Sequence, residues 1–222
     1  FKTHNIDVII CTLLENYNLF EQILVKYNKK CKLVLHIGNN NPPHVIEKMG
    51  VTNLFSSAWC TFISANIPNK VFARQEFSQE LFVPSSTCNK KSIINLKHIL
   101  NQEELQPLID IGNSLPNSWD IKIYGLNNKN GILAGDEKSF SDVVKQCGFV
   151  YHVKHIDEGY GHNIHNAFSC GKPVITDSQK MGVNWHGEFI KNTPHLLFEP
   201  DINIIDIATN TIDNIVSKLI TM

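Results

Sequence analysis

Residues 158–175 read EGYGHNIHNAFSCGKPVI, and this stretch decides how we interpret the whole chain. It follows an apolar segment, 149–153, that is typical of a buried strand, and it contains a helical pattern over 161–170 that ends at a glycine. Gly159 and Gly161 free the backbone to approach a ligand closely. The first amides of a helix suit phosphate because they have no acceptor within the helix. The stretch therefore predicts an anion site where the loop becomes the helix.

Two charged side chains near this loop complement such a site. Glu158 only accepts hydrogen bonds when it is ionised, so it suits the hydroxyls of a sugar, and Lys154 adds a positive charge for phosphate. A carboxylate beside an anion-binding helix end is the combination that a nucleotide sugar requires. Each charge also has a plainer interpretation, as a solvated carboxylate and a surface lysine, which the sequence leaves open.

Short apolar segments alternate with helical patterns outward from this stretch. The strand predicted at 32–37 and the helix predicted at 102–115 are examples. We also predict a helix over 139–147, closed by Gly148, and a last helix over 204–220. This order is typical of βαβ units around a parallel sheet, and therefore of an α/β fold. Such sheets bind ligands at the carboxyl ends of their strands, so we expect the site in the loops that follow the strands.

The composition excludes several classes of protein. Of the 222 residues, 42% are hydrophobic and 18% charged, which is typical of a folded chain. The net charge of −1 argues against a strongly basic nucleic-acid binder. No apolar run is long enough for a membrane span, so we expect none. The cysteines form no C-x-x-C pair, which argues against zinc-ribbon and thioredoxin-like proteins and favours reduced thiols in the cytoplasm.

The same stretch resembles the donor-site motif of retaining glycosyltransferases of the GT-B fold. Their pattern runs E-G-F-G, then a helix ending in E-A-x-A, then C-G-x-P-V-I. The resemblance covers about residues 90–222 and implies two Rossmann-like lobes with parallel sheets, of which the N-terminal one is short here. The matching residues are Glu158, Gly159, Tyr160, Gly161, Ala167, Cys170, Gly171, Pro173, Val174 and Ile175.

The resemblance implies a role for several residues of the loop and helix. Glu158 would orient the donor sugar, and His162 would line the donor pocket. Lys154 would stabilise the leaving diphosphate, which is an electrostatic contribution to catalysis. The backbone positions implied near the sugar and the diphosphate are Gly159, Tyr160, Gly161 and Asn163.

The chain departs from the family pattern at one position. The second glutamate of the motif, which holds the nucleotide ribose, is Asn166 here. An amide can hydrogen-bond a ribose, but without the strength that a charged acceptor gives. Lys97 is the candidate for the basic residue that meets the diphosphate, and the loop that starts at Ile132 is the candidate contact for the base.

The polar segment 84–87 is the predicted boundary between two lobes. We predict an acceptor-side lobe over 1–87 and a nucleotide-sugar-binding lobe over 88–222. The first is shorter than its counterpart in the family and begins without an initiator methionine, so we expect it to be pared down or to lack its first βα units. His36 and Asn39 follow a predicted strand where the acceptor side would place polar groups, although a buried histidine and a turn asparagine explain them equally well.

A cluster of histidines near the motif raises the question of a metal site. His162 and His165 share a helix face, and acidic residues precede them. We expect no metal, because His155 and His162 flank a loop and because the family implied by the resemblance needs no protein-bound metal.

These observations predict a cytoplasmic, metal-independent glycosyltransferase that needs no cofactor beyond its substrate, a UDP- or GDP-linked sugar. It would transfer the sugar to an acceptor hydroxyl, with the retention of configuration that the resemblance implies. The acceptor (a glycan, a protein, a lipid or, with less support, a modified DNA base) and the oligomeric state stay open. Two alternatives remain. One is a non-catalytic nucleotide-sugar-binding module, which Asn166 and the short first half favour; the other is a sugar-nucleotide epimerase on the same fold.

Overall fold

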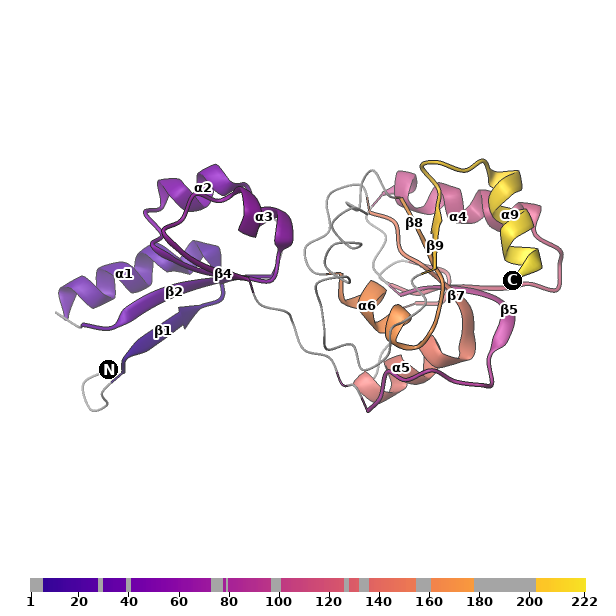
Figure 1. The fold of residues 1–222 in the computed structure, drawn as a ribbon, viewed down its shortest axis with the longest axis horizontal. Coiled ribbons are helices and arrows are strands. Elements are labelled where there is room, and N and C mark those ends of the chain that lie inside the picture. Colours follow the sequence, from indigo (N-terminus) through magenta and orange to yellow (C-terminus); the bar gives the residue numbers. More distant parts are fainter. Residues whose placement is uncertain are drawn as a thin grey trace. The chain divides into compact units, whose positions relative to one another are not determined.

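The computed structural model describes two compact units, and each is an α/β body built on a parallel sheet (Figure 1). Residues up to 76 belong to the first unit, and most of the chain from 77 onward belongs to the second. The described residues are 6–27, 30–38, 41–72, 78, 80–96, 101–125, 128–131, 136–154, 161–177 and 203–222, with the side chains of 59 and 60 excepted.

The first unit is a sheet of four parallel strands in the order β1-β2-β3-β4. The strands are β1 (Val8–Cys11), β2 (Lys32–Ile37), β3 (Asn53–Ser56) and β4 (Asn69–Phe72). A 3-10 turn, η1 (Leu14–Asn16), and three helices connect them: α1 (Tyr17–Lys26), α2 (Pro43–Lys48) and α3 (Trp59–Ser64). All three helices lie on the same side of this sheet (Figure 1).

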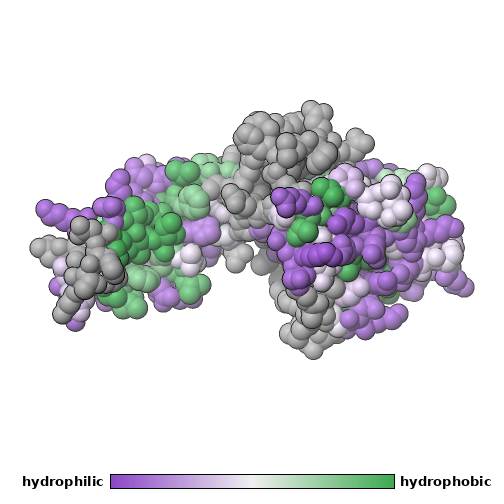
Figure 2. Space-filling model, turned by 90° about the horizontal axis from the view of Figure 1, so that it is seen from below, coloured by the Kyte–Doolittle hydropathy of each residue, from purple (hydrophilic) through white to green (hydrophobic). Residues whose placement is uncertain are grey.

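The core of the first unit is therefore one-sided. Leu33, Leu35 and Leu54 point to the helices and are buried against them. The alternate strand residues point the other way, so Ile10 is 60% exposed and Val71 is 59% exposed. Figure 2 shows hydrophobic surface gathered over this unit. A parallel sheet is normally covered on both faces, so an open apolar face is an unusual feature of this unit.

The second unit is a sheet of five parallel strands in the order β6-β5-β7-β8-β9. The strands are β5 (Asn89–Asn95), β6 (Asp120–Ile123), β7 (Cys147–Tyr151), β8 (Val174–Thr176) and β9 (Ile204–Asp206). The helices are α4 (Gln102–Ser114), α5 (Glu137–Gln146), α6 (His162–Ser169) and α9 (Ile212–Thr221). The direction of winding reverses between β5 and β7, which makes this position the topological switch point.

Helices cover both faces of the second sheet (Figure 1). On one face, Val144 of α5 and Phe168 of α6 pack with Val150 and Val174 of the strands. On the other face, residues of α4 and α9 pack with a different set of strand residues: Ile93, Phe149, Tyr151, Ile175 and Ile205. The strands are thus apolar on both sides, as expected for a doubly wound sheet.

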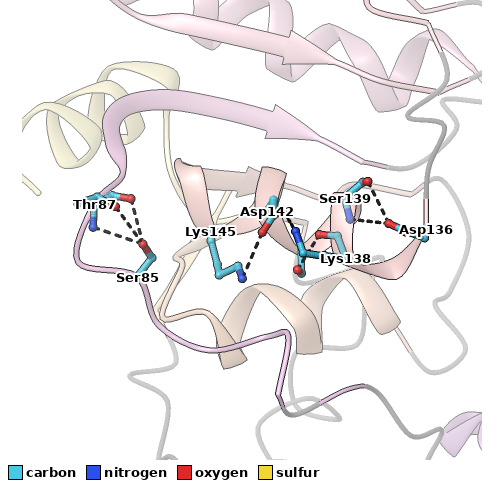
Figure 3. Close-up of polar contacts among 8 residues, drawn as sticks. Ser85, Thr87, Asp136, Lys138, Ser139, Asp142 and Lys145 are labelled. Atoms are coloured by element: carbon cyan, nitrogen blue, oxygen red, sulfur yellow. Dashed lines mark hydrogen bonds and ion pairs between the residues drawn. The ribbon is translucent and has the colours of Figure 1, made fainter.

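Side chains at the helix starts explain where these helices begin. The Asn101 side chain accepts a hydrogen bond from the Glu104 amide, and the Thr211 side chain accepts one from the Asn214 amide. Asp136 accepts from both the amide and the hydroxyl of Ser139, at 2.9 and 3.0 Å (Figure 3). These bonds lower the pKa of Asp136.

The fold class expected from the sequence is confirmed, with two corrections to the elements. Residues 204–220 do not form one helix, because β9 precedes α9 and Asp206 bonds to the Ala208 amide and the Thr209 hydroxyl between them. Gly148 does not close a helix but lies within β7. A side chain at this position would collide with the Lys90 carbonyl oxygen of β5.

Residues 80–87 pack with the second unit. The ring of Phe82 is 2% exposed and lies 6.0 Å from the ring of Phe140, between centroids. The predicted extents of the two lobes, 1–87 and 88–222, stay a prediction.

Candidate functional site

The carboxyl ends of β5 and β7 meet at the switch point of the second sheet. Asn95, the last residue of β5, is fully buried, and its Nδ2 donates a hydrogen bond of 3.1 Å to the Tyr124 carbonyl oxygen. At the end of β7, the Tyr151 hydroxyl donates a hydrogen bond of 2.6 Å to the Glu104 carbonyl oxygen. These bonds connect the ends of both central strands to neighbouring segments. They therefore fix the position of the sheet edge at which a ligand would bind.

The second of these bonds joins β7 to the first turn of α4. Burial raises the pKa of Tyr151 above its ordinary value, and the nearby Glu104 carboxyl adds to the effect, so the phenol remains a neutral donor. Glu104 itself is 1% exposed. Sequence reasoning missed this buried acid, and the one signal for it was its place three residues after the Asn101 cap.

Helix α6 begins beside this edge at Gly161, as the sequence predicts. Gly161 has a φ of 76°, in the left-handed region, which residues with a side chain rarely adopt. Its carbonyl oxygen accepts hydrogen bonds from the amides of Ile164 and His165, at 2.9 and 3.1 Å. The first turn is thereby closed, and the helix N-terminus, with its positive dipole end, lies on the carboxyl side of the sheet.

Two buried polar side chains lie on one face of α6. Asn166 and Ser169 are each 5% exposed, and their spacing of three places them on the same side of the helix. Within the described part of the chain, Asn166 Oδ1 and Ser169 Oγ have no hydrogen-bond partner. A buried polar atom left unpaired costs about 1–3 kcal/mol, so native proteins pair such atoms with other protein groups, water or a ligand. Sequence reasoning named Asn166 and missed Ser169.

The structure places part of the predicted site on and around α6. Gly161, His162, Asn163 and Asn166 lie at its start and along it, and His162 and Asn163 are partly buried. Lys154, also partly buried, follows the end of β7. The predicted residues outside the described part of the chain are Glu158, Gly159, Tyr160, Lys97, Ile132 and Asn39.

His36 belongs to the first unit, in β2. Its Nε2 lies 3.4 Å from Ser57 Oγ, and its ring centroid lies 5.2 Å from that of Phe55 on β3. It is partly buried and lies on the open face of the sheet, in register with Phe55. These local contacts account for its position, and its predicted acceptor role stays a prediction.

The thiols near α6 are unsuited to nucleophilic chemistry. Burial raises the pKa of Cys170 to about 11 and that of Cys147 to about 12, against the weaker opposing effect of Lys172. Both thiols stay protonated at neutral pH. Cys170 is packed in the core of the second unit, with Gly171 in the left-handed conformation after it.

In the part of the chain that the structure describes, no group of three or more His, Cys, Asp or Glu side chains is arranged to hold a metal ion. The helices in this part are also too short or too polar to cross a membrane.

Comparisons with known proteins give a likeness in structure. No family model and no curated protein matches the sequence. Three crystal structures of HepE from Anabaena are similar to the chain. The complex with UDP superposes with a TM-score of 0.73 at 13% identity, over 97% of this chain and 69% of HepE. The complex with UDP and glucose gives 0.71 at 13% identity over 96% and 68%. The complex with UDP-glucose gives 0.69 at 12% identity over 96% and 69%. At these identities the likeness shows the fold.

Proposed function

We propose that the second unit binds a nucleoside diphosphate sugar at the N-terminus of α6, and that the chain is a glycosyltransferase. One observation carries the proposal. A left-handed glycine opens α6 beside the switch point, and the same helix carries Asn166, which is buried with an unpaired oxygen among the described residues. Ligands of doubly wound sheets bind at this place. The similarity to HepE, whose crystal structures contain UDP or UDP-glucose, supports UDP as the nucleotide.

The proposed roles follow from the chemistry of each group. The amides at the start of α6 would hold the diphosphate, with Lys154 and Lys97 as additional cations. Asn166 would hydrogen-bond the ribose, and Glu158 would orient the sugar hydroxyls. When the glycosidic bond breaks, negative charge grows on the leaving diphosphate. Fixed amides and cations that are already aimed at this charge stabilise the transition state.

The acceptor, the retention of configuration and the cytoplasmic location belong to the same proposal. The location is supported by the cysteines, since every cysteine whose side chain is described is a free thiol. Buried Cys147 and Cys170 need no disulfide for their packing, because they lie within the core of the second unit.

Thermal unfolding in the presence of UDP, UDP-glucose, GDP and GDP-mannose tests the donor site. A ligand at about 100 times its Kd adds roughly 2.7 kcal/mol, which raises the midpoint of a domain of this size by about 5–10 °C. We expect UDP and UDP-glucose to raise the midpoint. Glu158→Gln should reduce the additional effect of the sugar and keep that of UDP. The control is Glu21→Gln, on the exposed side of α1, which should change neither shift. No shift with any of the four compounds would contradict the proposal.

A non-catalytic binding module is the second candidate, and the neutral Asn166 favours it, because the bond to the ribose lacks charge assistance. UDP release from UDP-glucose separates the two candidates. A transferase releases UDP slowly when water is the acceptor. It releases UDP faster when a suitable hydroxyl compound is present. A module binds UDP-glucose and releases no UDP above the rate without protein.

A further inference from the structure

The second unit holds a pocket whose described lining does not include the start of α6. Its volume is about 720 Å³, within the range of small-molecule sites. It lies over β6, the edge strand of the sheet, and the C-terminal part of α5 forms one of its walls. Among the predicted donor-site residues that the structure describes, which are Lys154, Gly161, His162, Asn163 and Asn166, none lines it. The lining comprises Ser86, Thr87, Cys88, Asn89, Ser92, Ile94, Asp120, Lys122, Tyr124, Val143, Gln146 and Cys147.

The side chains on β6 give the pocket one acceptor and one donor of opposite charge. Asp120 and Lys122 lie two residues apart on the same strand face and form an ion pair of 3.2 Å. Their side chains are 45% and 47% exposed, so both can still reach a ligand. The hydrogen bond to Asp120 raises the pKa of Lys122, which stays an ammonium group. Because the two charges cancel and the carboxylate repels anions, the pocket does not favour a phosphate.

The opposite wall is held in place by local hydrogen bonds. Ser85 Oγ accepts a hydrogen bond of 3.3 Å from the Thr87 amide, which shapes the segment before β5 (Figure 3). Ser92 Oγ donates to the Asn89 carbonyl oxygen at 2.7 Å and accepts from the Gly148 amide at 3.0 Å. Ser86 and Thr87 thus belong to a segment of the wall whose backbone is held by hydrogen bonds.

Two apolar side chains belong to the pocket lining, and the β5 backbone in it is already paired. Ile94 and Val143 are apolar lining residues, and Ile94 is 3% exposed. The backbone of β5 is paired with β6 on one side and β7 on the other. A peptide strand therefore cannot add to β5, and a ligand here is recognised by side chains: a carboxylate, an ammonium, an amide, hydroxyls and the Tyr124 ring.

We propose that this pocket binds a neutral carbohydrate, as a short oligosaccharide. Sugar hydroxyls can donate to Asp120 and accept from Lys122 and Gln146, since ionised carboxylates only accept and ammonium groups only donate. The C–H faces of a sugar ring match the apolar surface of Val143, which is partly buried, and the ring of Tyr124. This site goes beyond the proposed donor site, and the two share none of the residues that the structure describes.

Alkylation of Cys88 by iodoacetamide reports on the occupancy of the pocket. Cys88 lines the pocket and is partly exposed. Its neighbour Cys147 has a pKa of about 12 and reacts slowly. Cys31 in the first unit is partly exposed too and serves as an internal reference. Peptide mass spectrometry gives both rates at millimolar maltotriose, cellotriose or chitotriose. We expect at least one of these oligosaccharides to slow the alkylation of Cys88 severalfold and to leave the alkylation rate of Cys31 unchanged.

A pair of double variants locates the effect. Asp120→Asn with Lys122→Met removes both charges of the pocket. The oligosaccharide concentration that half-protects Cys88 should then rise about tenfold. The matched control is Asp142→Asn with Lys138→Met, an exposed ion pair of 3.2 Å on α5 outside the pocket lining (Figure 3). Exposed ion pairs contribute little to stability, so both double variants should fold, which thermal unfolding verifies.

Three results would overturn the proposal. They are no protection by any of the three oligosaccharides, equal loss of protection in both double variants, and protection by UDP as strong as that by the sugars. The three oligosaccharide samples contain no nucleotide, so their outcome is independent of the proposed donor site, and UDP is tested in a separate sample.

Discussion

Burial gives several residues of the second unit an ionisation that differs from that of the unfolded chain. Cys147 and Cys170 have pKa values of about 12 and about 11 in the fold, against 9.0 for an ordinary thiol. Tyr151 shifts in the same direction, from 10.0 upward. All three are neutral when protonated, so the folded state retains protons that the unfolded state releases at high pH.

This difference predicts a loss of stability at alkaline pH. Below about pH 7.5 both states hold the thiol protons, and the contribution is complete. Above it the unfolded chain loses protons first, so the free energy of unfolding falls, by up to roughly 1.4 kcal/mol per pH unit and thiol. Urea unfolding between about pH 8 and about pH 10.5 measures this fall. Cys170→Ala should reduce the slope, and an equal slope in this variant would contradict the explanation.

The residues of the candidate site differ in how visible they are in the sequence. Gly161 and Asn166 could be named because their positions belong to a motif with fixed spacing. Glu104 and Ser169 could not, since an exposed helical glutamate and an exposed helical serine have the same sequence pattern. Their burial, 1% and 5% exposed, is a consequence of tertiary packing.

The elements themselves follow the sequence where one periodicity dominates. The strand predicted at 32–37 coincides with β2, because Leu33, Leu35 and Ile37 alternate toward the helices. The prediction of one helix over 204–220 was wrong, because a short apolar run has no periodicity that separates a strand from a helix turn. Asp206 and the Thr211 cap supply the break between β9 and α9.

The start of α6 is the element on which the proposed function depends most. Gly161 and Gly171, at the two ends of α6, have φ values of 76° and 67°, so alanine at either position has the same left-handed backbone strain. The cost of the left-handed conformation is about 1–2 kcal/mol. Gly161→Ala and Gly171→Ala should therefore each lower the free energy of unfolding by about this amount, which urea unfolding measures. Gly171 follows the C-terminal end of α6, and a Cβ there meets only an ordinary contact, so its variant carries the strain away from the proposed diphosphate site.

The most unusual feature of the molecule as a whole is the open face of the first sheet. Val8, Ile10 and Val71 are 48%, 60% and 59% exposed, while the helices cover the other face. The sequence predicts buried strands here but does not show that one face of the sheet is left open. That outcome depends on the face of the sheet on which the connecting helices lie.

This open face predicts binding of an apolar dye. The chain should enhance the fluorescence of anilinonaphthalene sulfonate in its folded state, because the dye binds contiguous apolar surface. Ile10→Lys should reduce the enhancement without lowering the unfolding midpoint, since the side chain is already exposed. Val25→Lys is the control, because Val25 is 77% exposed on α1, away from that face. Equal dye binding in both variants, or unfolding caused by Ile10→Lys, would contradict an open face.

The central claim is that the N-terminus of α6 holds the diphosphate of a nucleotide, and calorimetric titration of UDP into the wild type, Gly161→Ala and Gly171→Ala tests it most directly. The two variants place alanine at similar left-handed φ values, 76° and 67°, at opposite ends of the same helix. We expect Gly171→Ala to bind UDP as the wild type does and Gly161→Ala to bind it at least about tenfold more weakly, a loss of about 1.4 kcal/mol. Equal UDP affinity in all three proteins would show that the diphosphate does not lie at this helix.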